Sequence, residues 1–398
     1  MSGLRPLPVP RGAAVRGLLA PLERALAGNE PLAPYAVEAP VPALPADPGP
    51  LPDGLALAVG TSGSTGRAKR ALLTVDNLVS SATATHQVLG GSGTWLLAMP
   101  AHHVAGLQVL VRSVVAGTEP GVVDLTGGFT AAAFVEATRA LVDRTSRPRY
   151  TALVPTQVSR LLDDPAGTAA MAQYDWVLVG GAAVPSSVLL AADCADVRLA
   201  ETYGMSETAG GCVYNGSPLP VSEVHIDNDQ HVVLGGSTVA HGYLGEPRLS
   251  SDVFEVDADG NRWFCTDDLG ELDELGLLHI RGRADDLINT GGLKVAPGAV
   301  EDAMTRYVPG VRDAVVVGTA HPAWGQAVSA AVTMLSGAPT PTVRDVRTAL
   351  RGILPDHALP QRLLVLDTIP LRGPGKPDRR ALVTAFDETL EADEGRTG

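Results

Sequence analysis

A short segment rich in glycine and hydroxyl residues, at positions 61–69, is the part of the chain best suited to binding phosphate. Small residues let backbone N–H groups approach phosphate oxygens, hydroxyls add donors, and a terminal lysine adds positive charge. The spacing differs from the Walker pattern, which separates its first glycine from Gly-Lys-Ser/Thr by four residues. A flexible surface turn is the alternative interpretation. The candidate phosphate-binding residues are Thr61, Ser62, Gly63, Ser64, Thr65, Gly66 and Lys69.

A second candidate is the lone arginine of the apolar segment 104–116, which is predicted to be a helix. A buried guanidinium needs an anion, carbonyls or solvent, so Arg112 is expected to meet one of these, and a structural salt bridge with Asp or Glu is one such arrangement. His103 lies nine residues earlier, so one continuous helix would put the two on opposite sides. We therefore expect His103 in the preceding loop. Adjacent His102 and His103 could hold a metal, but no further ligand cluster accompanies them.

The composition limits the classes of function. The 398 residues suggest roughly two or three domains. The 30 basic and 44 acidic residues give a formal net charge of −14, so general binding to nucleic acid is not expected. Cys194, Cys212 and Cys265 are odd in number and far apart, which argues against disulfides or zinc and favours the reducing cytoplasm. No run of about 18 apolar residues predicts a membrane span.

The elements that must position these residues alternate between strands and helices. The segment 39–53 is rich in proline and is interpreted as an extended linker. Short apolar runs then predict strands, and the longer segments 130–142 and 156–162 predict helices between them. This alternation favours βαβ units and a mostly parallel sheet. The predicted strands are residues 55–59, 95–99, 122–125, 150–154 and 176–179.

The pattern changes from about residue 221 onward. Short strands at 231–233, 263–266 and 277–280, joined by Gly and Asp turns, predict a β-rich subdomain. After residue 283 the prediction is helix 297–307, strands 313–317 and 328–334, helix 343–354 and strand 363–366. The expected fold is therefore α/β and α+β. It has a large N-terminal domain, residues 1–283, with mostly parallel sheets and the β-rich subdomain, and a small mobile C-terminal α+β domain, residues 284–398.

Several motifs, taken in order, resemble those of the adenylate-forming superfamily of acyl-CoA synthetases, peptide-synthetase adenylation domains and luciferases. The glycine-rich segment resembles its phosphate loop. Residues 201–208, Glu-Thr-Tyr-Gly-Met-Ser-Glu-Thr, match its Tyr-Gly-x-Ser/Thr-Glu motif, and residues 282–288 match its hinge motif. Residues 375–379, Gly-Lys-Pro-Asp-Arg, resemble its Gly-Lys-x-x-Arg motif. The resemblance covers residues 55–382, and the chain is short for the superfamily, with a reduced N-terminal region.

The resemblance implies a site for ATP and Mg²⁺. Tyr203 would stack on adenine, Thr208 would contact the α-phosphate, and Glu207 would hold Mg²⁺, because a carboxylate beside a triphosphate needs a bridging cation. Asp268 of Thr-Asp-Asp-Leu-Gly would bind the ribose, although Asp267 stands where the family has glycine. A capping role for Glu207 and a surface turn for Asp268 are the structural alternatives. The other nucleotide-binding residues implied are Gly180, Gly181, Ala182, Gly204, Met205 and Arg283.

The remaining motifs imply a second step with coenzyme A. Lys376 would assist adenylation, Asp285 would be the pivot between domains, and Gly292 and Lys294 would lie near the coenzyme A tunnel. Composition alone would make Lys376 a solvated loop cation and residues 282–288 a charged, solvated interdomain turn. The implied chemistry is attack of a carboxylate on the α-phosphorus of ATP, followed by displacement of AMP by the thiol.

The acid is indicated by residues 100–107, Pro-Ala-His-His-Val-Ala-Gly-Leu, which resemble a segment of the o-succinylbenzoate–CoA ligases of menaquinone biosynthesis. Residues 154–158 and 210–214 resemble their acid-pocket strands and loops. The implied acid-binding residues are His103, Arg112, Thr156, Gly204 and Thr208. Another aryl or medium-chain acyl-CoA ligase and a nucleotide-binding protein without catalysis are the alternatives; Glu207 and Lys376 argue against the latter. A homodimer is compatible with the sequence.

Overall fold

The computed structural model describes residues 3–45, 48–61, 69–372 and 376–397, with side chains through residue 389. The described chain divides into two compact units. The first comprises Met1–Val184, Val188–Thr266 and Leu272–Leu278, and the second comprises Pro185–Ser187, Asp267–Glu271 and His279–Gly398. No described helix is long and apolar enough to cross a membrane.

The first unit opens with a four-stranded sheet in the order β1-β2-β3-β4. The predicted linker has no regular structure in its described part, but it joins β2 to β3 of this same sheet. Strand β1 contains two prolines, Pro6 and Pro8, and is an edge strand, where the missing N–H groups cost least. The strands are β1 (Arg5–Val9), β2 (Leu32–Ala36), β3 (Leu55–Gly60) and β4 (Arg70–Thr74).

A seven-stranded sheet in the order β11-β10-β9-β8-β7-β5-β6 forms the centre of the first unit. Its strands from β6 to β9 are parallel, which confirms the prediction of a mostly parallel sheet, and β10 is antiparallel to β9. The strands are β5 (Thr94–Leu97), β6 (Gly121–Val122), β7 (Arg149–Leu153), β8 (Trp176–Gly180), β9 (Leu199–Met205), β10 (Gly210–Tyr214) and β11 (Ser217–Pro218).

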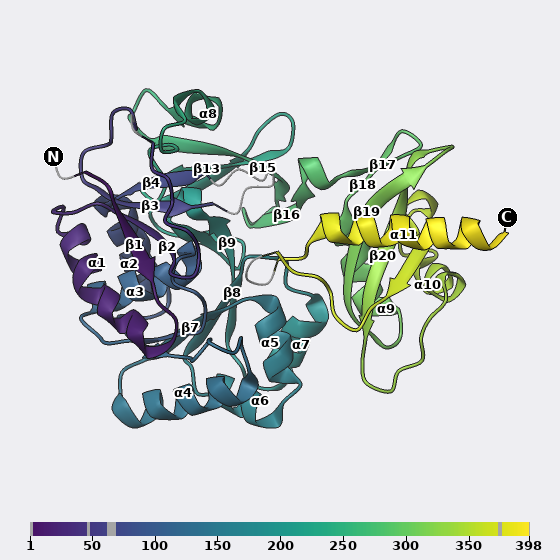
Figure 1. The fold of residues 1–398 in the computed structure, drawn as a ribbon, viewed down its shortest axis with the longest axis horizontal. Helices are drawn as coiled ribbons and strands as arrows, with labels where there is room; N and C mark the ends of the chain where they lie inside the picture. The colour runs from purple at the N-terminus through teal and green to yellow at the C-terminus, as the bar shows by residue number, and fades with distance from the viewer. Residues whose placement is uncertain (1–2, 46–47, 62–68, 373–375, 398) are drawn as a thin grey trace. The chain divides into compact units, whose positions relative to one another are not determined.

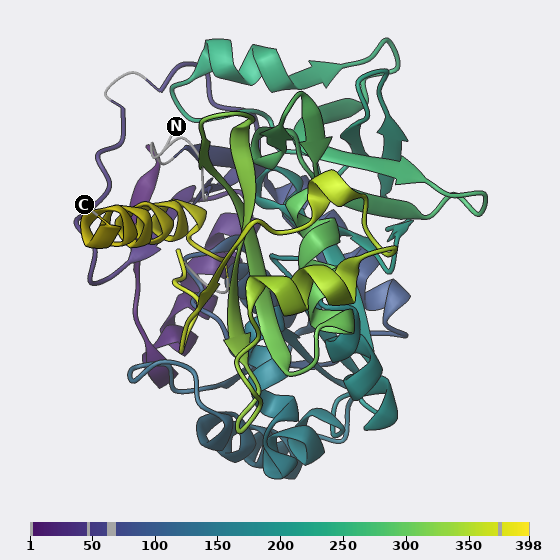
Figure 2. The ribbon, with the colours of Figure 1, turned by 90° about the vertical axis from the view of Figure 1, so that its right-hand side faces the viewer.

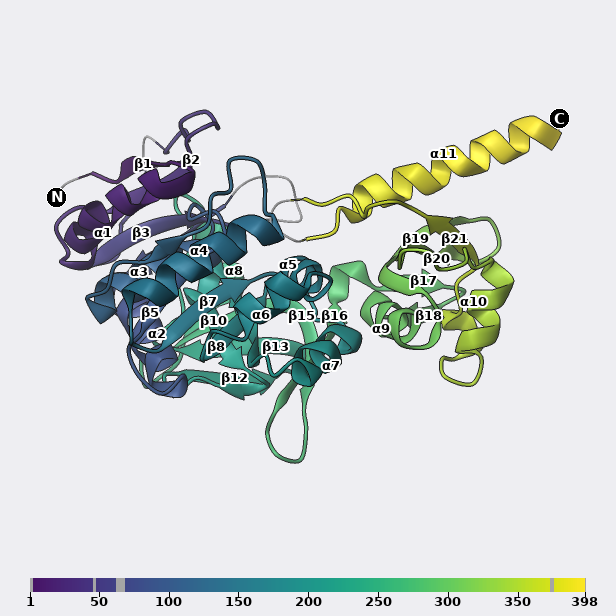
Figure 3. The same cartoon turned by 90° about the horizontal axis from the view of Figure 1, so that it is seen from below.

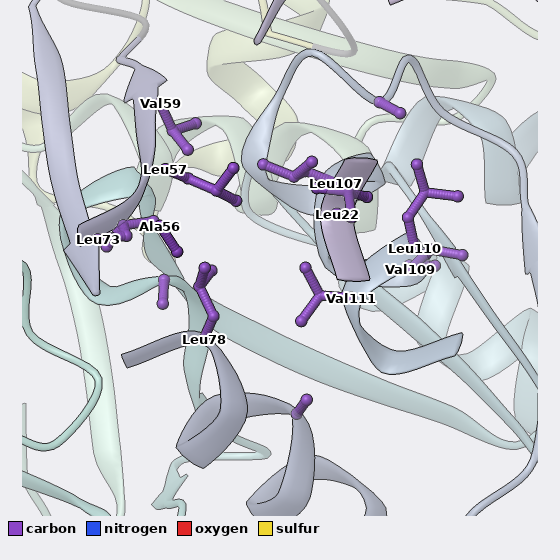
Figure 4. Packing of buried hydrophobic residues seen from close by; sticks show 14 of the residues in the cluster. Leu22, Ala56, Leu57, Val59, Leu73, Leu78, Leu107, Val109, Leu110 and Val111 are labelled. Atoms are coloured by element: carbon purple, nitrogen blue, oxygen red, sulfur yellow. The ribbon is translucent and has the colours of Figure 1, made fainter. Parts of the chain in front are cut away.

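Successive side chains of a strand point to opposite faces of the sheet, and the two faces of this sheet pack against different layers of helices. Trp95 and Leu97 pack with α1, α2, α3 and the first sheet, whereas Leu96 and Val177 pack with α4–α7. Figure 1 shows α4, α5 and α6 gathered on the lower side of this unit. Figure 4 shows Leu22 of α1 and Leu107 of α3 beside the side chains of β3. The helices are α1 (Leu19–Leu26), α2 (Val75–Val88), α3 (Val104–Ala116), α4 (Ala131–Arg144), α5 (Pro155–Leu162), α6 (Pro165–Met171) and α7 (Ser186–Cys194).

The predicted β-rich subdomain is a third sheet in the order β12-β13-β15-β14, with β16 paired to β15. Strands β12 and β13 pair antiparallel, as do β14 and β15. The short helix α8 precedes β14. The elements are β12 (Ser222–Ile226), β13 (His231–Gly236), α8 (Pro247–Val253), β14 (Phe254–Val256), β15 (Arg262–Leu272) and β16 (Leu278–Arg283).

The second unit contains a five-stranded sheet in the order β18-β17-β20-β19, with β21 parallel to β20. Val316 and Val328 face α9 and α10, whereas Val315 and Val317 face α11. Figures 2 and 3 show α11 on one side of the long strands and α10 on the other. The elements are β17 (Ile288–Thr290), β18 (Leu293–Val295), α9 (Pro297–Tyr307), β19 (Val311–His321), β20 (Gly325–Met334), α10 (Val343–Leu350), β21 (Arg362–Val365) and α11 (Arg379–Thr397).

Candidate functional site

The Tyr-Gly-x-Ser-Glu motif forms a tight connection between β9 and β10. Gly204 has φ +152°, and a Cβ added there would lie 2.1 Å from the carbonyl oxygen of Gly210, so only glycine fits. The chain then makes one 3-10 turn, Ser206–Thr208. The pairing of β9 with β10 shifts register just after this connection. The motif is therefore a defined backbone shape rather than a flexible loop.

Hydrogen bonds from three directions hold this turn. The hydroxyl of Ser206 donates to the carbonyl of Gly60 at the end of β3 (3.1 Å), and Gln108 of α3 donates to the carbonyl of Ala209 (2.6 Å). Thr208 is fully buried, and its hydroxyl donates to the carbonyl of Gly210 (2.8 Å) and accepts from the N–H of Met205 (3.0 Å). The Thr208 hydroxyl thus stabilises the turn in this structure.

Glu207 projects from the turn as a buried carboxylate, 8% exposed. The phenol of Tyr243 donates a hydrogen bond of 2.8 Å to its Oε1. The ammonium of Lys69 lies 5.1 Å from the centre of the Tyr243 ring. The Tyr243 phenol thus contacts both the Glu207 carboxylate and the ammonium of Lys69, the last residue of the candidate phosphate loop. The carboxylate oxygens of Glu207 have the chemistry that Mg²⁺ prefers, so the residue present fits this ion.

The expected adenine-side residues lie at the carboxyl ends of two adjacent parallel strands. Gly180 pairs with Thr202, and a Cβ at Gly180 would lie 2.4 Å from the Thr202 hydroxyl oxygen, so the strands need glycine there. Gly181 and Ala182 follow β8, and Tyr203, which is half-buried, follows Thr202. In open α/β sheets, ligands bind at this end of the strands.

The structure describes the candidate phosphate loop, residues 61–69, only at its two ends. The N–H of Thr61 donates to the carbonyl of Lys69 (2.8 Å), which brings the two ends together between β3 and β4. The hydroxyl of Thr61 is buried and has no hydrogen-bond partner among the residues that the structure describes. The other candidate loop residues, namely Ser62, Gly63, Ser64, Thr65 and Gly66, lie outside the described residues.

His103 is the N-cap residue of α3 with an extended backbone, as expected for the loop before the helix. Its ring lies 4.2 Å from that of His102, centre to centre. Burial lowers the pKa of His102; nearby Glu38 raises it and Arg11 lowers it further. Thr156 is half-buried in the first turn of α5.

Arg112 is 3% exposed and carries a guanidinium without a carboxylate within salt-bridge distance in the described chain. It donates to the hydroxyl of Tyr214 (3.2 Å) and stacks 4.8 Å above Trp95, while its Nε atom has no hydrogen-bond partner among the described residues. Burial lowers the pKa of Arg112, and Tyr214 opposes this shift. Burial lowers the pKa of His86 to about 4, and the Arg112 charge adds to the shift. The expected alternative, a salt bridge to Asp or Glu, is absent from the described structure.

In the second unit, Arg283 forms ion pairs with three carboxylates. It bonds both oxygens of Asp285 (2.8 and 3.1 Å) and lies 3.1 Å from Asp267 and 3.5 Å from Asp268. Burial lowers the pKa of Arg283. The hydrogen bonds and the charge of Asp285, together with the charges of Asp268 and Asp267, raise it by more, so the pKa of Arg283 lies above its usual value. The candidate ribose, phosphate and hinge residues are thus one ion-pair network.

Lys376 lies on a segment whose flanks are joined to each other. The N–H of Arg372 donates to the Lys376 carbonyl (2.7 Å), that of Asp378 donates to the Pro370 carbonyl (2.8 Å), and Leu371 bridges Pro377. The side chain of Lys376 is exposed.

The candidate coenzyme A residues also belong to the second unit. Gly292 is in the turn between β17 and β18 and has φ +83°. Lys294 is exposed on β18. The N–H of Gly291, in the same turn, donates to the carbonyl of Trp324 (2.9 Å).

Sequence reasoning missed Tyr243 and Gln108. Both make hydrogen bonds to the motif turn, but each is remote from it in sequence, by 36 residues to Glu207 and by 101 to Ala209. The available signal was a polar side chain inside an apolar segment, at Gln108 in helix 104–116 and at Tyr243 after the glycine of His-Gly-Tyr-Leu. Such residues need a buried partner, but the sequence does not identify which.

A parallel sheet with a buried acidic turn at the carboxyl ends of its strands is typical of nucleotide-binding proteins of the α/β class. The profile described as "AMP-binding enzyme" matches residues 16–244, and the one described as "AMP-binding enzyme C-terminal domain" matches residues 299–376. The chain belongs to the AMP-binding enzyme family.

Relatives agree with this assignment. The chain is 43% identical over 388 residues to a protein of Mycobacterium tuberculosis named "Probable 2-succinylbenzoate--CoA ligase", with 96% of this chain and 98% of the relative covered. ATP-bound MatB from Rhodopseudomonas palustris has a similar fold, with a TM-score of 0.80 at 21% identity, covering 97% of this chain and 89% of that one. The o-succinylbenzoate CoA synthetase of Bacillus subtilis, in complex with the acyl-adenylate OSB-AMP, gives a TM-score of 0.72 at 22% identity, covering 96% and 88%.

Proposed function

We propose that this chain converts 2-succinylbenzoate to its coenzyme A thioester, at the cost of ATP, by way of an acyl-adenylate. The proposal is supported by family membership and by a relative of that name that is 43% identical over almost the full length of both chains. The bound acyl-adenylate named for the Bacillus protein is the intermediate that this route requires. We further propose a cytoplasmic location, where ATP and coenzyme A are available.

The main structural support for this acid is the buried guanidinium of Arg112. Gln108 and Arg112 are four residues apart, so they lie on the same face of α3, about 6 Å apart along its axis. Gln108 bonds the carbonyl of Ala209, which follows Thr208, and Arg112 bonds Tyr214 at the other end of β10. An acid activated near Thr208 could extend along β10 toward this guanidinium. A second carboxylate, as in succinylbenzoate, would supply the missing anion.

In the first half-reaction, one carboxylate oxygen of the acid attacks the α-phosphorus of ATP, and pyrophosphate leaves. Negative charge accumulates on the phosphate oxygens, so fixed cations and N–H donors stabilise the transition state. We assign this role to Lys69, Lys376 and the backbone of the phosphate loop. Glu207 would hold Mg²⁺, which when bound neutralises charge on the phosphates. His103 and Thr156 would line the acid pocket, and Thr208 would contact the α-phosphate. Tyr203 would stack on adenine, and Gly181 and Met205 would also contact the nucleotide.

In the second half-reaction, the thiolate of coenzyme A attacks the acyl carbonyl, and AMP leaves with the pair of electrons of the broken C–O bond. We propose that Lys376 withdraws at this stage and that Gly292 and Lys294 accompany the thiol. The pivot is assigned to Asp285, and the domain boundary to residues 283 and 284. Asp268 and Arg283 would hold the ribose and phosphate through both steps.

An acid screen tests the proposal. Pyrophosphate release and thioester formation are measured with ATP, Mg²⁺ and coenzyme A for 2-succinylbenzoate, its analogue without the ring carboxylate, benzoate and a medium-chain fatty acid. The expected result is a kcat/KM for 2-succinylbenzoate at least tenfold above the others. A preference for a monocarboxylate would instead establish another aryl or medium-chain ligase, and ATP binding without pyrophosphate release from any acid would establish a non-catalytic homologue.

A further inference from the structure

The hydrogen bond between Tyr243 and Glu207 joins the motif turn to a segment to which the proposed mechanism assigns no role. Tyr243 is 6% exposed and Glu207 8%, and the donor–acceptor distance is 2.8 Å. A hydrogen bond to an ionised carboxylate is roughly twice as strong as one between neutral groups. Removing its donor therefore changes the orientation of the carboxylate as well as its energy.

Tyr243 itself has little freedom to move. Its N–H donates to the hydroxyl of Ser250 (2.8 Å), and its backbone forms an antiparallel bridge with Ala71 of β4. Its ring meets that of Phe254 edge to face, with the centres 5.3 Å apart. The phenol is thus fixed relative to β4, the strand that begins directly after Lys69.

The same segment also holds the backbone of Glu207. The N–H of Ala240, three residues before Tyr243, donates to the Glu207 carbonyl (2.8 Å). On either side of Tyr243, the carbonyl of Gly242 accepts from Leu72 (2.9 Å), and the N–H of Leu244 donates to the Arg70 carbonyl (2.9 Å). Both ends of Glu207, the main-chain carbonyl and the carboxylate, therefore depend on residues 240–244, which are bonded to β4.

We propose that Tyr243 is a positioning residue that fixes the Glu207 carboxylate for Mg²⁺ at the triphosphate. This inference rests on the proposed function for the identity of the nucleotide reaction, but its central claim concerns metal binding. Residues that hydrogen-bond a metal ligand typically change metal affinity or activity about 10- to 100-fold when mutated. The ammonium of Lys69 lies over the face of the Tyr243 ring, so one residue contacts both the Lys69 cation and the Glu207 carboxylate.

The test uses Tyr243→Phe, which removes only the hydroxyl. The phenyl ring keeps the edge contact with Phe254 and the face presented to Lys69, so the packing is retained. Tyr174→Phe is the matched control, because Tyr174 is also buried (4% exposed) and its hydroxyl also makes one hydrogen bond, of 2.8 Å to Thr138. Tyr174 belongs to the hydrophobic cluster that packs against α4, and this cluster contains no candidate site residue.

Two measurements decide the proposal. The first is the affinity of Mn²⁺, followed by electron paramagnetic resonance, for the full-length protein saturated with a non-hydrolysable ATP analogue. We expect Tyr243→Phe to weaken it about 10- to 100-fold and Tyr174→Phe to leave it unchanged. The second is the Mg²⁺ dependence of acyl-AMP formation, which should shift to higher concentration in Tyr243→Phe, whereas thioester formation from preformed acyl-AMP should not change.

A double variant separates positioning from a general structural effect. If Tyr243 acts through Glu207, adding Tyr243→Phe to Glu207→Gln should weaken Mn²⁺ binding by less than about twofold further, because the effects of coupled residues are not additive. Wild-type Mn²⁺ affinity in Tyr243→Phe, equal losses in both tyrosine variants, or additive losses in the double variant would overturn the proposal. Failure of the wild type to adenylate any acid would refute the proposed function, while the Mn²⁺ measurement would still decide the role of Tyr243.

Discussion

Replacing Arg112 by methionine should separate substrate recognition from stability. The unbranched methionine side chain fills most of the space of the arginine stem. The protein loses a hydrogen bond from a charged donor to Tyr214, about 2 kcal/mol, and a cation–π contact with Trp95, also about 2 kcal/mol. The variant also avoids the cost of burying a guanidinium that has no carboxylate partner in the described structure, and this stabilises it by several kcal/mol. We therefore expect the free energy of unfolding to change by less than about 1 kcal/mol.

Catalysis should respond differently. In Arg112→Met, the second carboxylate of 2-succinylbenzoate would enter an apolar site without its counter-charge, which costs about 2–5 kcal/mol. This corresponds to a decrease in kcat/KM of about 30-fold to several thousand-fold. The analogue without the ring carboxylate should be used as well as before, or better. The assay compares kcat/KM for the two acids in wild type and variant, and urea unfolding provides the stability.

Three results would contradict this reasoning. Equal decreases for both acids would show that Arg112 acts through the fold, and wild-type activity on both would show that it does not contact the acid. A loss of more than about 3 kcal/mol of stability would mean that its contacts with Tyr214 and Trp95 outweigh the cost of burying its charge.

Three further predictions concern the rest of the chain. Lys376→Ala should reduce acyl-AMP formation by roughly 10²-fold or more while preserving conversion of preformed acyl-AMP to thioester; equal damage to both half-reactions would contradict the proposed withdrawal of this lysine. Asp268→Ala should raise the ATP concentration needed for half-maximal rate, because the ribose hydroxyls lose their acceptor. The acid concentration needed for half-maximal rate should stay unchanged. A change in the requirement for the acid alone would contradict a role in binding the nucleotide. Burial raises the pKa of Cys212 to about 12, so a thiol reagent at pH 8 should modify the exposed Cys194 in the native protein and Cys212 only after unfolding, as peptide mapping would show.

The sequence predicted the fold best where periodicity and packing agree. The runs that became β3, β7 and β8 are apolar because both faces of these strands are covered, and their alternation with helices left few other arrangements. Strands β1 and β2 were not predicted, because Pro6, Pro8 and Pro34 resemble linker residues. Their pairing depends on tertiary contacts with β3 that no local pattern contains.

The candidate site was predictable in its motif residues but not in its supporting contacts. A motif specifies that Glu207 is needed, whereas the residue that orients it can come from any segment that the fold brings within 3 Å. The phase argument for Arg112 and His103 was sound, since His103 precedes the helix. The partner of Arg112 was not predictable, because a buried arginine commonly forms a salt bridge and this one contacts a phenol and an indole instead.

The joined flanks of Lys376 have an entropic consequence if this lysine engages and withdraws once in every turnover, as the proposed mechanism requires. Ordering a free backbone costs about 1–2 kcal/mol per residue, in addition to the cost of the side chain. The bonds from Arg372 to Lys376 and from Asp378 to Pro370 already order the adjoining backbone. On the proposed mechanism, each engagement then costs the ordering of the lysine side chain, about 2 kcal/mol, but not of these bonded flanking residues. A smaller entropy change at each pass would help to keep the adenylating and thioester-forming states close in free energy, as a reversible cycle between them requires.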